Sequence, residues 1–261
     1  MFKKIYHLVL RLYRLFFILD KESYLFFCKN LLFSIPSIVR DRSTSLPYTL
    51  MHSRMTKFHV KNVNIIIPGI WFGYAGEIYA SNVYFPNKDF LIKDGDTVLD
   101  LGASGGVFTI LAAKLGGRVM AVEPNRHALD LLIQNAKLNN CLDKIIPIWG
   151  LVGGTTGDMS NKKILENLRH KGVLPPHLVI EELRNEHKID RFQFVKIDIE
   201  GSESDLFRNL EWLDCVDKIA MELHLPYCDP SLIKKSLESK KFEVVYKEYN
   251  NESGYLYAKS R

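Results

Sequence analysis

Residues 98–108 read VLDLGASGGVF, and residues 119–125 read VMAVEPN. The first stretch is an apolar strand, a glycine-rich turn and the start of a helix, and the second is another strand that ends in Glu123. In an open parallel sheet, such a turn lets backbone N–H groups approach a ligand, and the acid after the second strand binds ribose hydroxyls. This order of elements predicts a site for a nucleotide-like cofactor.

The spacing of the glycines distinguishes between cofactors. A dinucleotide site needs G-x-G-x-x-G, and Gly102, Gly105 and Gly106 do not fit that spacing. The segment from Asp100 to Gly106 instead resembles the D-x-G-x-x-x-G turn of class I S-adenosylmethionine (SAM) methyltransferases, and the ammonium and sulfonium of SAM suit the aspartate. An ordinary turn would explain the glycines by their backbone angles, but it would explain neither Asp100 nor Glu123.

Length and composition indicate one catalytic domain with additional N-terminal material. The chain has 261 residues, is 47% hydrophobic and 25% charged, and has a net charge of +5 that lies largely in the first 61 residues. Because this excess is modest and lies outside the expected catalytic part, we predict that nucleic acid is an unlikely partner. The four cysteines form no C-x-x-C pair, so no zinc motif is present.

The first 35 residues are strongly apolar, but charged residues interrupt every window long enough to cross a bilayer. Lys4, His7, Arg11 and Arg14 instead form one basic stripe of an amphipathic helix. Residues 1–20 either lie on a membrane surface or pack on protein. The expected location is cytoplasmic, with peripheral contact to the inner face of the membrane as the alternative.

The remaining pattern predicts two parts, an N-terminal helical extension and linker over residues 1–60 and a catalytic domain over residues 61–261. Apolar runs alternate with helical patterns from Thr97 onward, which indicates an α/β fold built from βαβ units. The expected strands are 97–101, 118–123, 145–149, 192–198 and 217–223. Residues 242–248 and 255–259 flank a turn-rich loop and predict a C-terminal β-hairpin. The class I resemblance implies a Rossmann-like, mostly parallel sheet of seven strands closed by this antiparallel hairpin.

The most specific segment is residues 192–203, FQFVKIDIEGSE. Strand alternation places Lys196 and Asp198 on one face, although central parallel strands are normally apolar throughout. Charged residues there need partners or a function. We expect Lys196 to pair with Glu222 on the next strand, beneath a functional layer of Asp198 and His224.

At this segment the chain resembles the FkbM family of methyltransferases. The resemblance rests on three motifs: the turn from Asp100 to Thr109, Glu123-Pro124-Asn125, and the KIDIEGSE segment from Lys196 to Glu203. It implies an O-methyltransferase that acts on a hydroxyl of a sugar, glycan, glycolipid or other small molecule. Ser104 stands where the family has asparagine, and we expect its hydroxyl to cap the following helix. Gly105 replaces a branched apolar residue.

These arguments give a candidate site at the carboxyl ends of the strands. His224 is the expected general base, with Asp198 and Glu200 orienting it or binding the acceptor. Asp198, Glu200 and Glu222 could gather a cation, but their spacing does not require one, so no metal is predicted. An RNA methyltransferase and a non-catalytic binding module of the same fold are the alternatives, and the oligomeric state is left open. The residues expected to bind SAM are Asp100, Gly102, Ala103, Ser104, Gly105, Glu123, Pro124, Asn125, Trp149 and Asp198.

Overall fold

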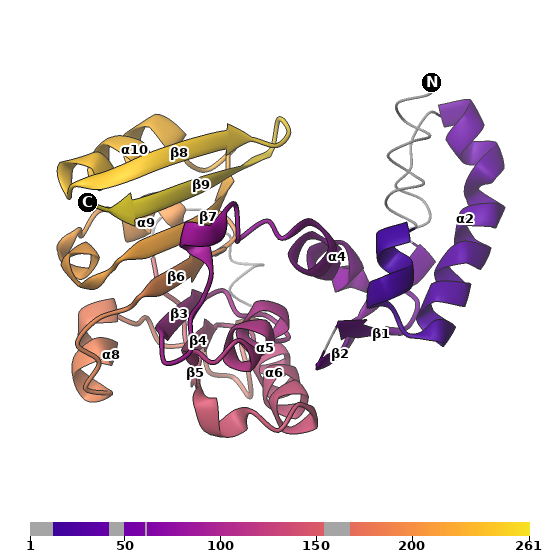
Figure 1. Cartoon of the computed structure of the whole chain (residues 1–261), viewed down its shortest axis with the longest axis horizontal. Helices are drawn as coiled ribbons and strands as arrows, with labels where there is room; N and C mark the ends of the chain where they lie inside the picture. The colour runs from indigo at the N-terminus through magenta and orange to yellow at the C-terminus, as the bar shows by residue number, and fades with distance from the viewer. Residues whose placement is uncertain (1–12, 42–49, 61, 154–167) are drawn as a thin grey trace. The chain divides into compact units, whose positions relative to one another are not determined.

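The computed structural model describes residues 13–41, 50–60, 62–153 and 168–261. The chain forms two compact units, Met1–Val83 and Tyr84–Arg261 (Figure 1). The division lies after residue 83, whereas the sequence predicted it after residue 60. The difference arises because the first hairpin and the helix after it belong to the N-terminal unit.

The N-terminal unit contains helix α2 (Lys21–Asp41), strands β1 (Met55–Val60) and β2 (Val63–Pro68), the short helix η1 (Gly69–Trp71) and helix α4 (Phe72–Ser81). β1 and β2 form a hairpin and pair antiparallel. Its core contains Phe27, Phe58 and Phe72, and the ring centroids of Phe27 and Phe72 lie 5.3 Å apart. Within the predicted helical extension and linker, α2 continues through Pro36 to Asp41.

The predicted basic stripe lies mostly in residues 1–12, outside the described residues. Residues 13–18 are helical, and Tyr13, Phe16 and Phe17 in this segment are all exposed. Attachment of residues 1–20 to a membrane therefore stays a prediction. Among the helices that the structure describes, none is both long and apolar enough to cross a membrane.

The C-terminal unit is built around a seven-stranded sheet in the order β5-β4-β3-β6-β7-β9-β8 (Figure 1). β9 pairs antiparallel with both β7 and β8, and the other neighbours are parallel. The predicted class I sheet with its C-terminal antiparallel hairpin is therefore confirmed. The strands are β3 (Thr97–Leu101), β4 (Arg118–Glu123), β5 (Ile145–Trp149), β6 (Phe194–Ile197), β7 (Lys218–His224), β8 (Phe242–Glu248) and β9 (Ser253–Ser260).

Helices cover both faces of this sheet. α5 (Val107–Lys114) packs on β3 and β4, and α6 (Arg126–Leu138) packs on β4 and β5. The opposite face buries Leu99, Val195 and Ile197 against apolar residues of α8 (Ile180–Glu186) and α10 (Pro230–Ser239). The other helices that the structure describes in this unit are short: η2 (Lys88–Phe90), η3 (Leu142–Lys144), α9 (Glu203–Leu206) and η5 (Glu211–Cys215). Because the parallel strands all end at the same edge, the loops after β3, β4, β5 and β6 come together there.

Candidate active site

The turn after β3 is held closely against the end of β6. Gly102 has a φ of +80°, and a Cβ at this position would lie only 1.8 Å from the carbonyl oxygen of Asp198. The backbone N–H groups of Gly102 and Ala103 both donate to the carbonyl of Val122, at 3.0 Å. The carbonyl of Gly105 accepts from Asn135 on α6 at 2.9 Å. Only glycine fits at position 102, and the turn is fixed from three sides.

Ser104 occupies the left-handed backbone region, with a φ of 49°. Its predicted role as a helix cap is wrong, because the cap residue of α5 is Gly106, and no side chain caps this helix. Asparagine adopts left-handed angles more readily than serine does. This preference explains why an asparagine would suit the position in related turns, independently of any capping.

Glu123 joins the turn after β3 to the loop after β4. It is 7% exposed, and its two oxygens accept from the backbone N–H groups of Ser104 at 2.7 Å and Asn125 at 2.8 Å. Burial raises the pKa of Glu123 to about 7, although these two N–H donors act in the opposite direction. Each carboxylate oxygen has a further lone pair, so the group retains the capacity to accept from two ribose hydroxyls.

The other residues predicted near the cofactor lie around Glu123. Trp149 is opposite Glu123 in the parallel register, and its indole N–H donates to the carbonyl of Pro124 at 2.8 Å. The Asn125 side chain accepts from the backbone N–H groups of His127 and Ala128, so it caps α6. Trp149 is half-buried, and its fixed ring offers an apolar face at the strand edge where the adenine of SAM is expected.

Asp100 and Lys196 form a buried ion pair beneath the turn. They are opposite each other in the register of β3 and β6, their Oδ1 and Nζ atoms lie 3.3 Å apart, and both side chains are fully buried. Asp100 also accepts from the Thr109 hydroxyl at 2.5 Å. Burial raises the pKa of Asp100 despite the nearby lysine and threonine. Asp100 thus supports the turn from below through Lys196 and Thr109. The sequence argument explained this aspartate by the positive charges of SAM.

The expected partner of Lys196 was Glu222, and the structure corrects this. Lys196 is opposite Ala220 on β7. Glu222 lies two residues further along β7, level with Asp198 in the same register. The lysine instead turns toward β3, where its Nζ donates to the carbonyl of Gly102 at 2.7 Å. A second ion pair joins Nζ to Oδ2 of Asp198 at 3.6 Å. Lys196 therefore ties the glycine turn to the end of β6.

Asp198 lies at the end of β6 and is 9% exposed. The hydroxyl of Tyr84 donates to its Oδ2 at 3.1 Å, on the same oxygen that faces Lys196. Tyr84 is itself 1% exposed, and its ring centroid lies 5.6 Å from the lysine Nζ. These contacts fix the orientation of the Asp198 carboxylate.

His224 ends β7 and lies between two glutamates. Its Nδ1 is 2.9 Å from Oε1 of Glu203, and its Nε2 is 3.3 Å from Oε2 of Glu200. Burial lowers the pKa of His224, but the hydrogen bonds to Glu200 and Glu203 outweigh it and raise the pKa to about 11. The bond to His224 also lowers the pKa of Glu200. The imidazole thus holds a proton at neutral pH in this arrangement, which makes it a donor, whereas the predicted role is that of a base.

The structure therefore brings the three predicted catalytic residues together. One ligand atom from each of Asp198, Glu200 and His224 lies within 4.8 Å of the others. Sequence reasoning missed the groups that support them, Tyr84 and Glu203. Glu203 is the last residue of the quoted motif, so its place in the sequence could have suggested a role. The structure shows that it is fully buried. No pattern connects Tyr84 to Asp198, which is 114 residues away.

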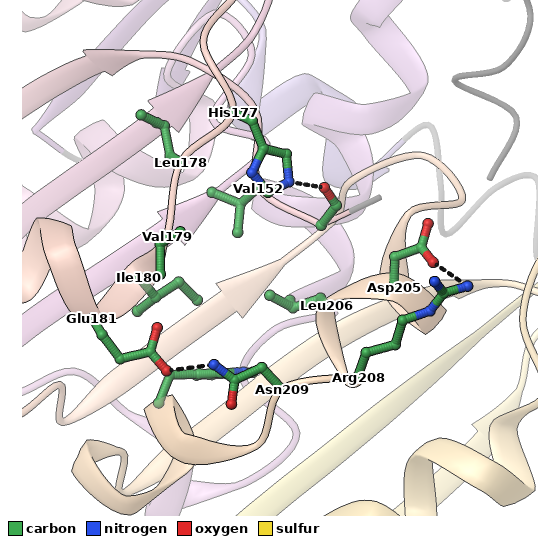
Figure 2. Close-up of a pocket in the computed structure, with 12 residues that line it drawn as sticks. Val152, His177, Leu178, Val179, Ile180, Glu181, Asp205, Leu206, Arg208 and Asn209 are labelled. Atoms are coloured by element: carbon green, nitrogen blue, oxygen red, sulfur yellow. Dashed lines mark hydrogen bonds and ion pairs between the residues drawn. The ribbon is translucent and has the colours of Figure 1, made fainter. Parts of the chain in front are cut away.

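A separate cavity of about 240 Å³ lies between the segments that precede α8 and follow β6 (Figure 2). Val152, Ile180 and Leu206 line it, and all three belong to the core on the side of α8. Polar residues at its rim pair with one another, as Glu181 does with Asn209 at 3.1 Å. None of the described residues that line this cavity is a predicted site residue.

Comparison with known proteins gives matches to methyltransferases. The model of the TRM5/TYW2 methyltransferase domain matches residues 87–213. A ribosomal protein L11 methyltransferase from Campylobacter hominis is 38% identical over 85 residues, which are 33% of this chain and 27% of that protein. The tRNA (guanine(37)-N(1))-methyltransferase Trm5b of Methanocaldococcus jannaschii is 36% identical over 90 residues, which are 33% of this chain and 26% of that protein.

Solved structures also resemble the chain. The crystal structure of M. jannaschii TYW2 in complex with AdoMet has a TM-score of 0.46 and 16% sequence identity, and the match covers 78% of this chain and 85% of that one. The chain spans about a quarter of the length of the curated relatives it matches.

The sheet, the glycine turn and the matched domain define the class of protein. The chain carries a SAM-dependent methyltransferase domain of class I, and its cofactor is SAM. The domain model that matches is that of the TRM5/TYW2 methyltransferases, so the prediction of an FkbM protein is wrong. The three motifs behind that prediction lie at the carboxyl ends of β3, β4 and β6, and features tied to a fold in this way do not separate its families.

Two further predictions change with this result. Nucleic acid was predicted to be an unlikely partner, and this is wrong, because a relative of this chain, Trm5b, is a tRNA methyltransferase. Net charge was a weak guide here, because it says nothing about a local site. Transfer to a sugar or other hydroxyl receives no support from the matches.

Proposed function

We propose that this protein transfers the methyl group of SAM to RNA, with tRNA as the substrate class to test first. The observation that carries the proposal is the match of the TRM5/TYW2 domain over residues 87–213. That range includes the turn at Gly102, the ribose-binding candidate Glu123, and the segment from Asp198 to Glu203. The match therefore spans the residues proposed to hold the cofactor together with Asp198 and Glu200, and it ends before His224.

The described residues fit SAM and a nucleobase acceptor. When bound, SAM supplies an electrophilic methyl group. Much of the acceleration of such a displacement comes from alignment in a pocket that excludes water, and the fixed turn at Gly102 suits this role.

A ring nitrogen that carries hydrogen must lose it on methylation, and Asp198 and Glu200 offer carboxylates to accept that proton. The protonated His224 beside them would stabilise negative charge that develops on the base.

If RNA is the acceptor, the basic partners of its phosphates would come chiefly from the N-terminal part of the chain. The excess of Lys and Arg lies largely in the first 61 residues, outside the methyltransferase domain. Contacts between such residues and phosphates supply most of the sequence-independent affinity for nucleic acid. Binding of RNA should therefore weaken steeply as salt is raised.

A second candidate is methylation of a ribosomal protein. It is favoured by the similarity to the L11 methyltransferase, which is 38% identical over 85 residues. An acceptor of this kind would be an amine, and the carboxylates of Asp198 and Glu200 could bind it in its protonated form.

The proposal is tested by offering labelled SAM to competing acceptors. The full-length protein is incubated with tritiated SAM and, in separate reactions, with unmodified tRNA, ribosomal RNA, ribosomal proteins and oligosaccharides. Label in RNA, located by nuclease digestion and mass spectrometry, is the expected result. His224→Gln should slow transfer to RNA by at least about tenfold, whereas His187→Gln, at the exposed end of α8, should have no effect.

Other outcomes contradict the proposal. Label in ribosomal proteins without label in RNA would support the second candidate. A protein that binds SAM in calorimetry but labels none of these acceptors would be the non-catalytic binding module.

A further inference from the structure

Asp198, Glu200 and His224 form a cluster at the ends of β6 and β7 that has the composition of a metal site. One ligand atom of each lies within 4.8 Å of the others, and Nε2 of His224 is 3.3 Å from Oε2 of Glu200. We propose that these three side chains bind a divalent cation of the first transition row. No metal was predicted from the sequence, because the spacing of Asp198, Glu200 and Glu222, the three acids considered there, does not require one.

The histidine is held as metal-binding histidines are held. Such residues usually donate their second ring N–H to a carboxylate, which fixes the tautomer and aims the free nitrogen at the metal. Here Nδ1 of His224 is 2.9 Å from Oε1 of Glu203, so Nε2 is the nitrogen that faces the cluster. Glu203 is not one of the three proposed ligands. Its contact with His224 is therefore evidence for the site that does not depend on the cluster itself.

Glu203 is costly to bury, which indicates that its position has a function. It is 0% exposed, and its other oxygen, Oε2, has no hydrogen-bond partner among the described residues. A buried carboxylate with an unsatisfied oxygen destabilises a fold unless a nearby positive charge compensates it. Without a metal, the protonated His224 supplies that charge. A cation bound through a neutral His224 would supply it instead, one imidazole ring away.

The carboxylate of Asp198 is also oriented by its neighbours. Its contacts with the Tyr84 hydroxyl and with Nζ of Lys196 both fall on Oδ2. The other oxygen, Oδ1, is left for a cation. The two contacts hold the carboxylate in one orientation, as the partners of ligating carboxylates do.

The charges in this region favour a cation. The carboxylates of Asp100, Asp198, Glu200 and Glu203 lie around Lys196 and His224 through the contacts described above. With a neutral imidazole as ligand, four negative groups face one lysine. A divalent ion would remove most of that imbalance, and SAM carries a further positive charge.

The donor atoms indicate which ion fits. Mg²⁺ and Ca²⁺ favour sets made only of oxygen, whereas one imidazole with two carboxylates suits Mn²⁺, Fe²⁺ or Zn²⁺. Three protein ligands also leave positions open for water or for an oxygen of the acceptor. Without a metal, the protonated His224 carries the positive charge at this site. With the ion bound, the ion would carry that charge next to the acceptor. The inference holds for any acceptor class, but it changes the roles proposed above: with the ion bound, Asp198, Glu200 and His224 are its ligands, and the two carboxylates no longer accept the acceptor's proton.

The test measures Mn²⁺ binding to the full-length protein without SAM or acceptor. Titration with Mn²⁺, followed by the loss of the free-ion signal in electron paramagnetic resonance, should show one equivalent bound. Glu200→Gln should weaken binding at least tenfold. The substitution should leave the fold intact because the Glu200 side chain is 86% exposed. His224→Gln should weaken binding at least as much. Matched controls on α8 and directly after it, Glu186→Gln and His187→Gln, should bind Mn²⁺ as the unsubstituted protein does.

A second substitution tests the supporting carboxylate. Glu203→Gln should weaken Mn²⁺ binding by about 10–100-fold, and circular dichroism establishes whether this variant is folded. The proposal is overturned if the unsubstituted protein binds neither Mn²⁺ nor Zn²⁺ at millimolar concentration. It is equally overturned if Glu200→Gln binds Mn²⁺ with unchanged affinity.

Discussion

Glu123 is held in place before any cofactor arrives, because backbone N–H groups from two different loops donate to its oxygens. We expect each charge-assisted hydrogen bond from a ribose hydroxyl to contribute about 1.5–3 kcal/mol. Glu123→Ala should therefore weaken SAM binding at least about tenfold, since about 1.4 kcal/mol corresponds to one decade. Calorimetric titration measures this, and unchanged affinity in a folded variant would remove the ribose assignment.

The same residue makes stability depend on pH. Its pKa is about 7 in the folded protein, against an ordinary value of 4.5, so the folded state binds the extra proton between these limits. The raised pKa contributes stability that is fully present below pH 4.5 and is lost as pH rises to about 7. The slope is at most about 1.4 kcal/mol per pH unit.

Urea unfolding of the natural protein and of Glu123→Gln at pH 5, 6, 7 and 8 isolates this effect. The difference in unfolding free energy between the two proteins should change through this window and level off above pH 7. A difference that stays constant from pH 5 to pH 8 would show that Glu123 titrates normally.

At the scale of elements, β3 and β6 are joined by buried charges. Lys196 is the group that compensates Asp100 and Asp198. Removing one partner of a buried pair typically costs about 3–5 kcal/mol, so Lys196→Met should lower the unfolding free energy by that amount. Lys235→Met, on the exposed side of α10, should change it little.

A double-mutant cycle distinguishes the partners. If Asp100 is the main partner, Asp100→Asn combined with Lys196→Met should be clearly less destabilised than the sum of the two single changes. Additive effects would mean that the lysine is held chiefly by the carbonyl of Gly102.

The sequence predicted this region in part, and the limit is physical. Alternation along β6 correctly placed Lys196 and Asp198 on one face, because it depends only on the strand itself. The partner of Lys196 depends on register with two neighbouring strands, and register is set by long-range packing. Asp100 and Glu222 were both within reach in principle, and only the observed pairing with β3 selects Asp100.

The glycine turn could be predicted from the sequence, because it depends on local patterns and not on the register between strands. Gly102 and Glu123 belong to local patterns of strand, turn and strand, so their placement follows from short segments. Tyr84 belongs to no such pattern, and its contact with Asp198 exists only in the folded domain. The proton on His224 was also beyond prediction, because it depends on Glu200 in the turn after β6 and on Glu203 at the start of α9, which only the fold brings beside β7.

At the scale of the whole molecule, the division after Val83 leaves every predicted site residue in the second unit. This unit contains the complete sheet and its own apolar core. Residues 84–261 expressed alone should therefore unfold cooperatively and bind SAM with the affinity of the full chain. Thermal unfolding and calorimetric titration test this, and Glu123→Ala in the same fragment is the control. A fragment that is unfolded, or folded without binding SAM, would contradict the prediction.

The closeness of Gly102 to Asp198 has a consequence for binding. Because there is no room for even a methyl group between them, we expect the turn after β3 and the end of β6 to move together. If the turn binds SAM and the end of β6 binds the acceptor, an adjustment on binding one substrate changes the site of the other. Linkage then requires each substrate to change the affinity of the other by the same factor. Calorimetric titration with SAM should accordingly give a different affinity when the acceptor is present.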